Sequence, residues 1–309
     1  MRTVIQNTFG GPEVLEIVEA ARPVPQAGEL LVRVHASGLN PVDAATRSGV
    51  FPLLGEPPFG LGWDISGVVE EVGAGADITF AVGDEVYGMP LFPAALTGYA
   101  EYVAAPAAHF ARKPASLDHV HAAALPLSGL TAWQGLVEAA QVKAGDRLLV
   151  HRAAGGVGHL VVQIAKARGA EVIALASAAK HEFVRGLGAD EVIDYQAVDF
   201  TEKLRDIDVV FDSAAQGERS LSVLRPGGVL VTIVENYDQE LIAKFEAAGR
   251  RFAGVSVQPD AAGLEAIAEL VQAGRLRPHV AEVFPLAEVS KAHELLDLSS
   301  VKGKIVLSV

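Results

Sequence analysis

Apolar and polar positions follow one pattern in the first third of the chain and a different one in the middle third. Up to about Asp118, short apolar runs alternate with turns rich in glycine and proline, and helical periodicity is scarce. Runs of this kind predict β-strands, and the clearest are ELLVRVHASGLN (29–40), DISGVVEEVG (64–73), AVGDEVYGM (81–89) and GYAEYVAAP (98–106). The first third is therefore expected to form a small β-barrel or a curled sheet.

The middle third alternates β-branched apolar runs with amphipathic helical patterns. The apolar runs lie at 146–153, 171–177, 190–195, 207–213 and 227–234, with RFAGVSV (251–257) as a sixth. Helical patterns lie between them at 158–168, 178–187, 200–204 and 217–224. Strands that alternate with helices over short connections predict an α/β fold with a doubly wound parallel sheet, covered on both faces.

The last fifty residues predict a helix at 264–274, followed by a strand, a helix and a strand. We expect this segment to return to the first domain, which divides the chain into residues 1–118, 119–258 and 259–309. The longest charge-free apolar stretch, 122–137, contains Pro126 and Gly129 and is short for a membrane span. It is interpreted as a buried loop and helix, so no membrane span is expected.

Composition removes several classes of function. A formal net charge of −13 argues against a nucleic-acid partner. The absence of cysteine excludes disulfides, thiolate zinc sites and cysteine nucleophiles, and it fits a reducing, cytoplasmic location. The sequence contains neither a P-loop nor a G-x-S-x-G elbow, so it gives no support to a kinase or a hydrolase.

A glycine cluster lies where the first apolar run of the middle third meets its first helix. The stretch from Ala153 to Gly158 reads AAGGVG. Glycine at 155 lets backbone approach a pyrophosphate, glycine at 158 lets the helix pack close to the strand, and the helix N-terminus presents unpaired N–H groups. We therefore predict a dinucleotide-binding turn that includes Ala154, Gly155, Gly156 and Val157.

This chain lacks the acidic residue that hydrogen-bonds the ribose hydroxyls of NADH in dinucleotide-binding folds. It should follow the glycines by about 20 residues, where the chain has Ala176 and Ser177, with Lys180 nearby and Tyr195 after the next strand. A hydroxyl and an ammonium suit a 2′-phosphate, so NADPH is favoured over NADH. The alternative is that Lys180 is a solvated helix residue and Ser177 its N-cap.

Seven segments together resemble a known family. They are GGPEVLEI, VHASGLNPVDAATRSGVFP, GWDISGVVEEVG, AVGDEVYG, AAGGVGHLVVQIAKARGAEVIA, LGADEVIDY and FDSAAQGERSLSVLRPGGVLVTI. In this order, over about Thr3 to Val309, they resemble the zinc-independent medium-chain dehydrogenases/reductases, in particular the quinone oxidoreductases and the reticulon-interacting mitochondrial oxidoreductases. The resemblance implies a GroES-like β domain, a Rossmann domain, and a homodimer joined near GGVLVTIV or RFAGVSV.

The resemblance also implies positions of cofactor contact. Ala154, Gly156 and Val157 match the pyrophosphate turn, and Ser177, Lys180 and Tyr195 match the 2′-phosphate pocket. Thr131 matches a residue near the nicotinamide. Further positions that match the cofactor lining are Ser213, Ala214, Ile233, Val234, Val255, Val257 and Lys304.

Asn40 is our candidate donor near the nicotinamide ribose or the substrate, and an Asx turn before Pro41 is the alternative. Zinc-dependent relatives carry a metal-binding cysteine in this region, so no metal is expected, and the histidines of HVH (119–121) are interpreted as ordinary surface or cap residues. Asp43 and Arg47 are expected to form a local ion pair. Related quinone oxidoreductases often have a tyrosine where this chain has Ala45, so no general acid can be named.

These observations favour an NADPH-dependent reductase that transfers a hydride to a quinone or an α,β-unsaturated carbonyl. Two alternatives stay open. One is an enoyl-thioester reductase of a biosynthetic pathway, which needs a long groove for a pantetheine arm. The other is an NADPH-binding redox sensor or adaptor that signals without turnover, and the alanine at 45 is compatible with it.

Overall fold

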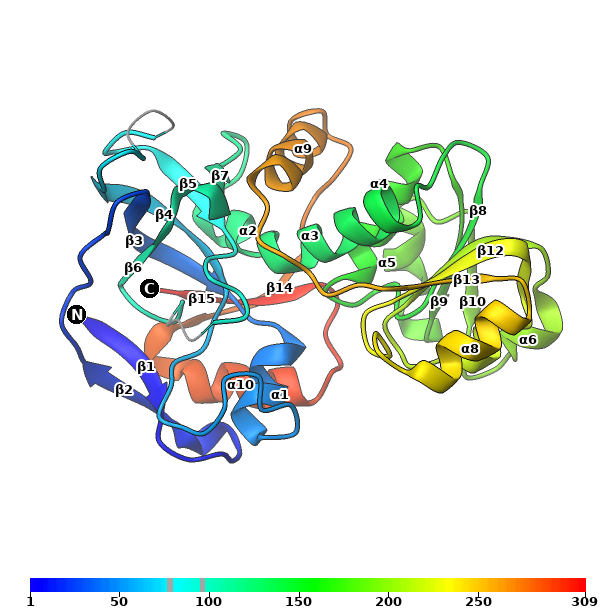
Figure 1. Ribbon diagram of the computed structural model, residues 1–309, viewed down its shortest axis with the longest axis horizontal. Helices are drawn as coiled ribbons and strands as arrows, with labels where there is room; N and C mark the ends of the chain where they lie inside the picture. The colour runs from blue at the N-terminus through cyan, green and yellow to red at the C-terminus, as the bar shows by residue number, and fades with distance from the viewer. Residues whose placement is uncertain (77–79, 95–97) are drawn as a thin grey trace. The chain divides into compact units, whose positions relative to one another are not determined.

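The computed structural model describes residues 1–76, 80–94 and 98–309. Contacts divide the chain into two compact units (Figure 1). Unit 1 comprises 1–130, 258–272 and 278–309, and unit 2 comprises 131–257 together with the short segment 273–277. No helix among these residues is long and apolar enough to cross a membrane.

Unit 1 is built on a seven-stranded, mostly antiparallel sheet. Its order is β14 (Val280–Pro285), β15 (Lys304–Ser308), β3 (Glu29–Gly38), β4 (Asp64–Val72), β5 (Glu85–Gly88) and β7 (Phe110–Arg112), and β6 (Tyr102–Pro106) also pairs with β3. A separate antiparallel pair joins β1 (Arg2–Gln6) and β2 (Leu15–Glu19). The last strand of the chain, β15, therefore lies beside β3 from its first third (Figure 1).

Apolar side chains at alternate positions along the strands form the core of unit 1. Leu30, Val32 and Val34 of β3 are two residues apart and pack into one apolar cluster with Ile65 and Val69 of β4. The pairing of β3 with β4 shifts register twice, between Leu31 and Val32 and between Val34 and Ala36. Such bulges bend a sheet, so the structure agrees with the curled sheet expected from the sequence.

Few helices occur in unit 1, and most are short. They are α1 (Pro41–Ser48), α2 (His119–Ala123), α9 (Ala261–Gln272) and α10 (Val289–Asp297). The helix α3 (Pro126–Trp133) runs across the division between the units and continues as a π-helical turn at Gln134–Ala139. The apolar stretch 122–137 is thus a helical, largely buried segment, as expected.

Unit 2 contains six parallel strands in the order β10 (Glu191–Asp194), β9 (Glu171–Ala176), β8 (Arg147–Val150), β11 (Ile207–Asp212), β12 (Leu224–Thr232) and β13 (Arg251–Gly254). Numbered within the unit, this is the order 3-2-1-4-5-6 of a doubly wound dinucleotide fold. The predicted parallel α/β sheet is confirmed. Dimer contacts were expected near GGVLVTIV (227–234) or RFAGVSV (251–257). The first run lies in β12, which is internal to the sheet, and the second lies in β13, which is the edge strand.

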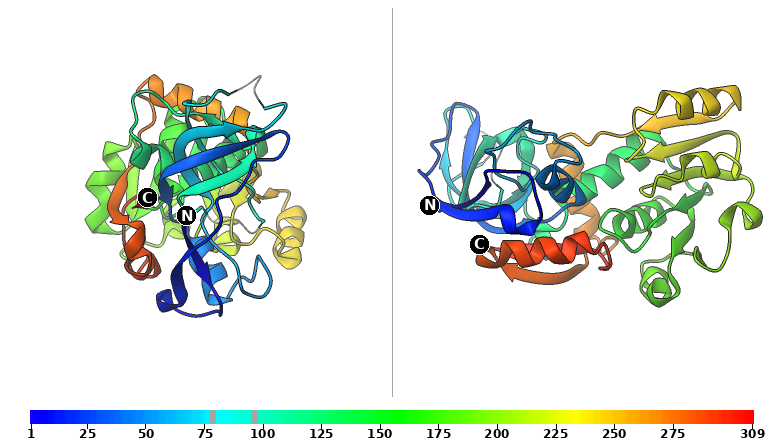
Figure 2. Two further views of the ribbon diagram at one scale, coloured as in Figure 1. Left: turned by 90° about the vertical axis from the view of Figure 1, so that its left-hand side faces the viewer. Right: turned by 90° about the horizontal axis from the view of Figure 1, so that it is seen from below.

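Helices cover both faces of this sheet. They are α4 (Gly158–Ala167), α5 (His181–Gly186), α6 (Phe200–Lys203), α7 (Gly217–Ser220) and α8 (Gln239–Ala247). Figures 1 and 2 show α4 and α5 against one face and α8 against the other. The helix expected at 217–224 is shorter than predicted because β12 already begins at Leu224, and the one expected at 178–187 opens with a 3₁₀ turn at Ala178–Lys180.

Candidate functional site

The glycine turn connects β8 to α4, as the sequence predicts. Arg152 adopts a left-handed conformation with φ of 48°, and the Gly155 N–H donates to the Arg152 carbonyl at 2.8 Å. A Cβ on Gly158 would lie 2.3 Å from the Arg152 carbonyl oxygen and 2.8 Å from the Ala153 Cα. Only glycine fits there without moving backbone, so the helix packs tightly against the end of its strand.

Three amides of this turn are available to a ligand. Within the described part of the chain, the N–H groups of Ala154, Gly156 and Val157 make no hydrogen bond to protein. They precede the N-terminus of the ten-residue helix α4, whose dipole favours a negative charge at this end. The arrangement suits a pyrophosphate. Gly155 differs from its neighbours, since its N–H is already used within the turn.

The residues expected at the 2′-phosphate follow two adjacent strands. Ala176 pairs in register with Asp194, so Ser177 and Tyr195 come next at the carboxyl ends of β9 and β10. Ser177 occupies the N-cap position of the 3₁₀ turn, but its hydroxyl makes no capping hydrogen bond. Lys180 ends that turn half-buried, and Tyr195 is 55% exposed. The side chains therefore border one edge of the sheet.

Asp212, at the end of β11, was not identified from the sequence. Its buried carboxylate accepts the N–H groups of Ala214 and Gln216, both at 2.7 Å, and burial raises the pKa of this carboxyl. The Ser213 hydroxyl donates to the His151 carbonyl at 3.3 Å. Asp212 thus holds the loop that carries two predicted cofactor residues, and an acid as the last residue of a buried apolar strand was the available signal.

Thr232 and Asn236 hold the chain that follows β12 through hydrogen bonds to backbone groups. The Thr232 hydroxyl oxygen accepts the Val234 N–H at 3.3 Å, which fixes the chain after Ile233. The Val255 N–H donates to the Thr232 carbonyl at 2.9 Å, and the Asn236 amide donates to the Val255 carbonyl at 2.9 Å. Two further predicted residues, Val257 and Thr131, are buried, the second within α3.

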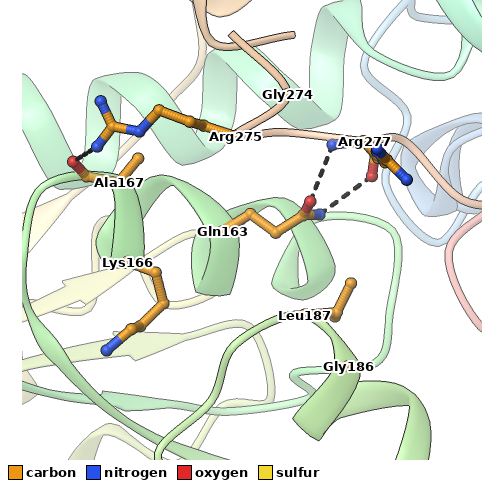
Figure 3. Close-up of a pocket in the computed structure, with 8 residues that line it drawn as sticks. All are labelled: Gln163, Lys166, Ala167, Gly186, Leu187, Gly274, Arg275 and Arg277. Atoms are coloured by element: carbon orange, nitrogen blue, oxygen red, sulfur yellow. Dashed lines mark hydrogen bonds between the residues drawn. The ribbon is translucent and has the colours of Figure 1, made fainter.

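A pocket of about 380 Å³ lies in unit 2 (Figure 3). It is lined by residues at the C-terminal ends of α4 and α5 and by the segment 274–277. Its Lys166 ammonium pairs with Asp190 at 2.8 Å, and Arg275 caps the Ala167 carbonyl. None of the predicted cofactor residues lines this pocket, so it is separate from the nucleotide turn.

In unit 1, Asn40 lies in a buried polar cluster with Asp64 and Lys304. The Asn40 amide nitrogen donates to Asp64 Oδ2 at 2.9 Å, and the Lys304 ammonium donates to Asn40 Oδ1 and, at 3.0 Å, to Asp64 Oδ2. Asp64 Oδ1 accepts the Leu127 N–H at 2.5 Å. The side chains of Lys304 and Asp64 are 2% and 0% exposed, so this ion pair is fully enclosed.

Asn40 is also the N-cap of α1, with Pro41 as the first helical residue. The Asn40 N–H donates to Asp43 Oδ2 at 2.6 Å in a capping box. Asp43 is completely buried, and this burial raises the pKa of its carboxyl to about 7. The cap and the Lys304–Asp64 contacts give Asn40 a structural role, while its contact with substrate or cofactor stays a prediction.

The expected ion pair between Asp43 and Arg47 is wrong. The Arg47 guanidinium bonds to Asp297 and to Nδ1 of His293, both at 2.8 Å. Both partners lie on or at the end of α10, which packs against α1, whereas Asp43 turns toward Asn40. Long-range packing thus overrode the local i, i+4 spacing.

The two histidines of HVH are engaged by unit 1. His119 stacks on His35 with 4.5 Å between ring centroids and contacts Ser66 and Glu85, while His121 pairs with Asp118, the N-cap of α2. Where zinc-dependent relatives place a cysteine, Asn40 has a buried ammonium beside its oxygen. That cation repels a divalent metal, so the residues present do not fit zinc.

A six-stranded doubly wound sheet with a glycine turn before its first helix, joined to a β-rich unit, defines a dinucleotide-binding protein of the medium-chain dehydrogenase/reductase class. Residues 26–115 match the alcohol dehydrogenase GroES-like domain, and residues 187–307 match a family described as zinc-binding dehydrogenase.

Three known proteins place the chain within that class. A quinone oxidoreductase structure from Coxiella burnetii is 37% identical, with a TM-score of 0.94 over 100% of this chain and 99% of that one. An Escherichia coli quinone oxidoreductase complexed with NADPH is 30% identical, with a TM-score of 0.89 over the full length of both chains. A chloroplastic NADPH-dependent alkenal/one oxidoreductase of Arabidopsis thaliana is 35% identical, over 99% of this chain and 79% of its own length. The chain belongs to the quinone oxidoreductase branch of the zinc-independent medium-chain family.

Proposed function

We propose that this protein is an NADPH-dependent reductase of quinones or α,β-unsaturated carbonyl compounds. The observation that carries the proposal is the turn before α4, with three amides that make no hydrogen bond to any group in the described residues. The names of the similar proteins support both the cofactor and the two acceptor classes.

The chain's own residues divide the binding of NADPH between them. The amides of Ala154, Gly156 and Val157 hold the pyrophosphate, and the missing side chain at Gly155 lets it approach. Ser177, Lys180 and Tyr195 hold the 2′-phosphate, since a hydroxyl and an ammonium favour this dianion and the residue directly after β9 is a serine rather than an acid. The remaining contacts are assigned to Thr131, Ser213, Ala214, Ile233, Val234, Val255 and Val257.

Bound NADPH supplies the hydride. The acceptor then gains negative charge on its oxygen, and a hydrogen-bond donor placed there lowers the barrier. Asn40 is the residue to which we assign this contact, because its side-chain nitrogen keeps a second hydrogen after bonding Asp64. A proton arrives from water or from a side chain, and Ala45 provides none.

Steady-state oxidation of NADPH tests the proposal, with a panel of quinones and of enones of increasing size as acceptors. Turnover of quinones or short enones is expected. Turnover restricted to long enoyl thioesters would assign the protein to biosynthetic reduction instead. Tight binding of NADPH with no oxidation by any acceptor would favour the sensor or adaptor.

We further propose a cytoplasmic homodimer joined through β13. This strand is the edge of the unit 2 sheet, and its unpaired backbone groups gain partners when a second copy adds to it. Sedimentation velocity on the purified protein tests the proposal, and a single species of about 32 kDa at micromolar concentration would contradict it.

A further inference from the structure

The amide of Asn40 is held between two groups of opposite hydrogen-bonding character. An ammonium has only donors, and a carboxylate has only acceptors. Lys304 contacts Oδ1 and Asp64 Oδ2 contacts Nδ2. Turning the amide over would set its NH₂ group against the ammonium and its oxygen against the carboxylate, so a single orientation is allowed.

Both groups that impose this orientation are themselves anchored. Lys304 opens β15 and Asp64 opens β4, the two strands that flank β3, and Asn40 follows the end of β3. Asp64 is further held by the Leu127 N–H at its other oxygen, and its own backbone carbonyl accepts the Ser37 hydroxyl at 2.8 Å. Groups placed on paired strands hold a side chain more firmly than groups on loops.

The Asn40 side-chain amide can form a further hydrogen bond only through its nitrogen. Asn40 Oδ1 accepts a hydrogen bond from the Lys304 ammonium and a longer one, at 3.5 Å, from the Ser128 hydroxyl. Asn40 Nδ2 donates one of its two hydrogens to Asp64. Within the described residues, the second hydrogen has no partner. Asn40 can therefore meet a ligand only as a donor.

We propose that Lys304 and Asp64 are positioning residues, which fix the Asn40 amide as a donor toward the oxygen that becomes negative during reduction. This rests on the proposed function, and it moves Lys304 from the cofactor contacts to the support of Asn40. The Lys304 ammonium is an internal cation in a region where zinc-dependent relatives bind their metal.

A charge-balanced variant separates positioning from stability. Lys304→Met alone leaves a buried carboxylate unpaired, and its Tm should fall by roughly 10 °C. Lys304→Met combined with Asp64→Asn removes both charges, and its Tm should recover because a neutral buried pair is often as stable as an ionic one. Its kcat should still fall about 10- to 100-fold, with the Kd for NADPH changed less than threefold.

A double-mutant cycle shows whether the effect passes through Asn40. Asn40→Ala should lower kcat by a similar factor, and adding the pair of substitutions to Asn40→Ala should lower it no further. Lys113→Met is the matched control, because this buried ammonium of unit 1 pairs with Glu85 at 3.2 Å, a carboxylate outside the Asn40 cluster. It should lower Tm and leave kcat unchanged.

Wild-type kcat in the pair variant would overturn the proposal, and so would a further loss of kcat in the Asn40→Ala background. A readout without turnover keeps it separate from the proposed function. The Asn40 side-chain NH₂ protons, followed by ¹⁵N-resolved exchange, should exchange at least tenfold more slowly in the wild type than in the pair variant. Equal exchange would overturn the positioning role even if the enzyme reduces quinones.

Discussion

Lys180 supplies the positive charge that we assign to the 2′-phosphate, one turn beyond the end of β9. Lys180→Ala should weaken binding of NADPH by about 10- to 100-fold and leave binding of NADH almost unchanged, because only NADPH carries the phosphate. Fluorescence titration with both cofactors measures the two Kd values. Lys203→Ala, at a half-exposed lysine of α6, is the control. Equal losses for NADPH and NADH would reject this assignment.

Asp43 makes the stability of the folded chain depend on pH. Its pKa of about 7 lies above the ordinary 3.8, so the folded protein keeps a proton that the unfolded chain releases. Stability therefore falls as pH rises from about 4 to about 7. His151 and His293 act in the opposite direction, since burial lowers their pKa values to about 4 and about 3, and stability falls as pH drops below 6.5.

Asp43→Asn isolates the carboxyl contribution. Relative to the wild type, the variant should gain up to about 4 kcal/mol in free energy of unfolding between pH 4 and pH 8, since about three pKa units are no longer lost. Urea denaturation across this range measures the difference. A difference that does not vary with pH would show that Asp43 ionises normally in the folded protein.

At the level of elements, the contact between α4 and its turn leaves no room at Gly158. Gly158→Ala should displace the helix N-terminus, lower the Tm and weaken NADPH binding at least tenfold, because a methyl group would meet the Arg152 carbonyl at 2.3 Å. Calorimetric titration checks the affinity. Gly186→Ala in α5 meets open space and should keep the wild-type affinity. Unchanged binding by the Gly158 variant would contradict the turn assignment.

Elements with local signals could be predicted, and contacts between distant residues could not. The strands of unit 2 follow from uninterrupted β-branched runs, and the turn between β8 and α4 follows from glycines placed between a strand pattern and a helix pattern. The Lys304–Asp64 pair joins residues 240 positions apart, and Arg47 finds Asp297 across 250 positions. Nothing near Arg47 in the sequence signals that choice, so the local pairing with Asp43 was expected instead. Asp212 and Thr232 escaped notice because their partners are backbone amides, which every sequence contains.

At the scale of the whole chain, the segment 273–277 belongs to unit 2 although the residues on both sides belong to unit 1. Gln163 of α4 holds it, with its Nε2 donating to the Arg277 carbonyl at 3.1 Å and its Oε1 accepting the Arg277 N–H at 2.8 Å (Figure 3). This buried amide, together with the Arg275 guanidinium that donates to the Ala167 carbonyl, secures this return of the chain.

Gln163→Leu should loosen the return without unfolding unit 2. Both Arg277 backbone groups would lose their partner, so hydrogen exchange at the Arg277 amide should accelerate by about 10- to 100-fold, while amides of β8 keep their protection. Gln272→Leu, at an exposed position of α9, serves as the control. Unaltered exchange at Arg277 would show that other packing secures the segment.

The position of β15 between β14 and β3 has a consequence for synthesis on the ribosome. Residues 304–308 are translated after all the other strands of their sheet, yet they fill its interior between β14 and β3. All residues of unit 2 have been translated by Arg277, so the domain encoded later can finish folding before the one encoded first. Until Lys304 emerges, the nascent chain carries an Asp64 carboxylate without its counter-ion, and a chain truncated before Lys304 would leave the carboxylate unpaired permanently.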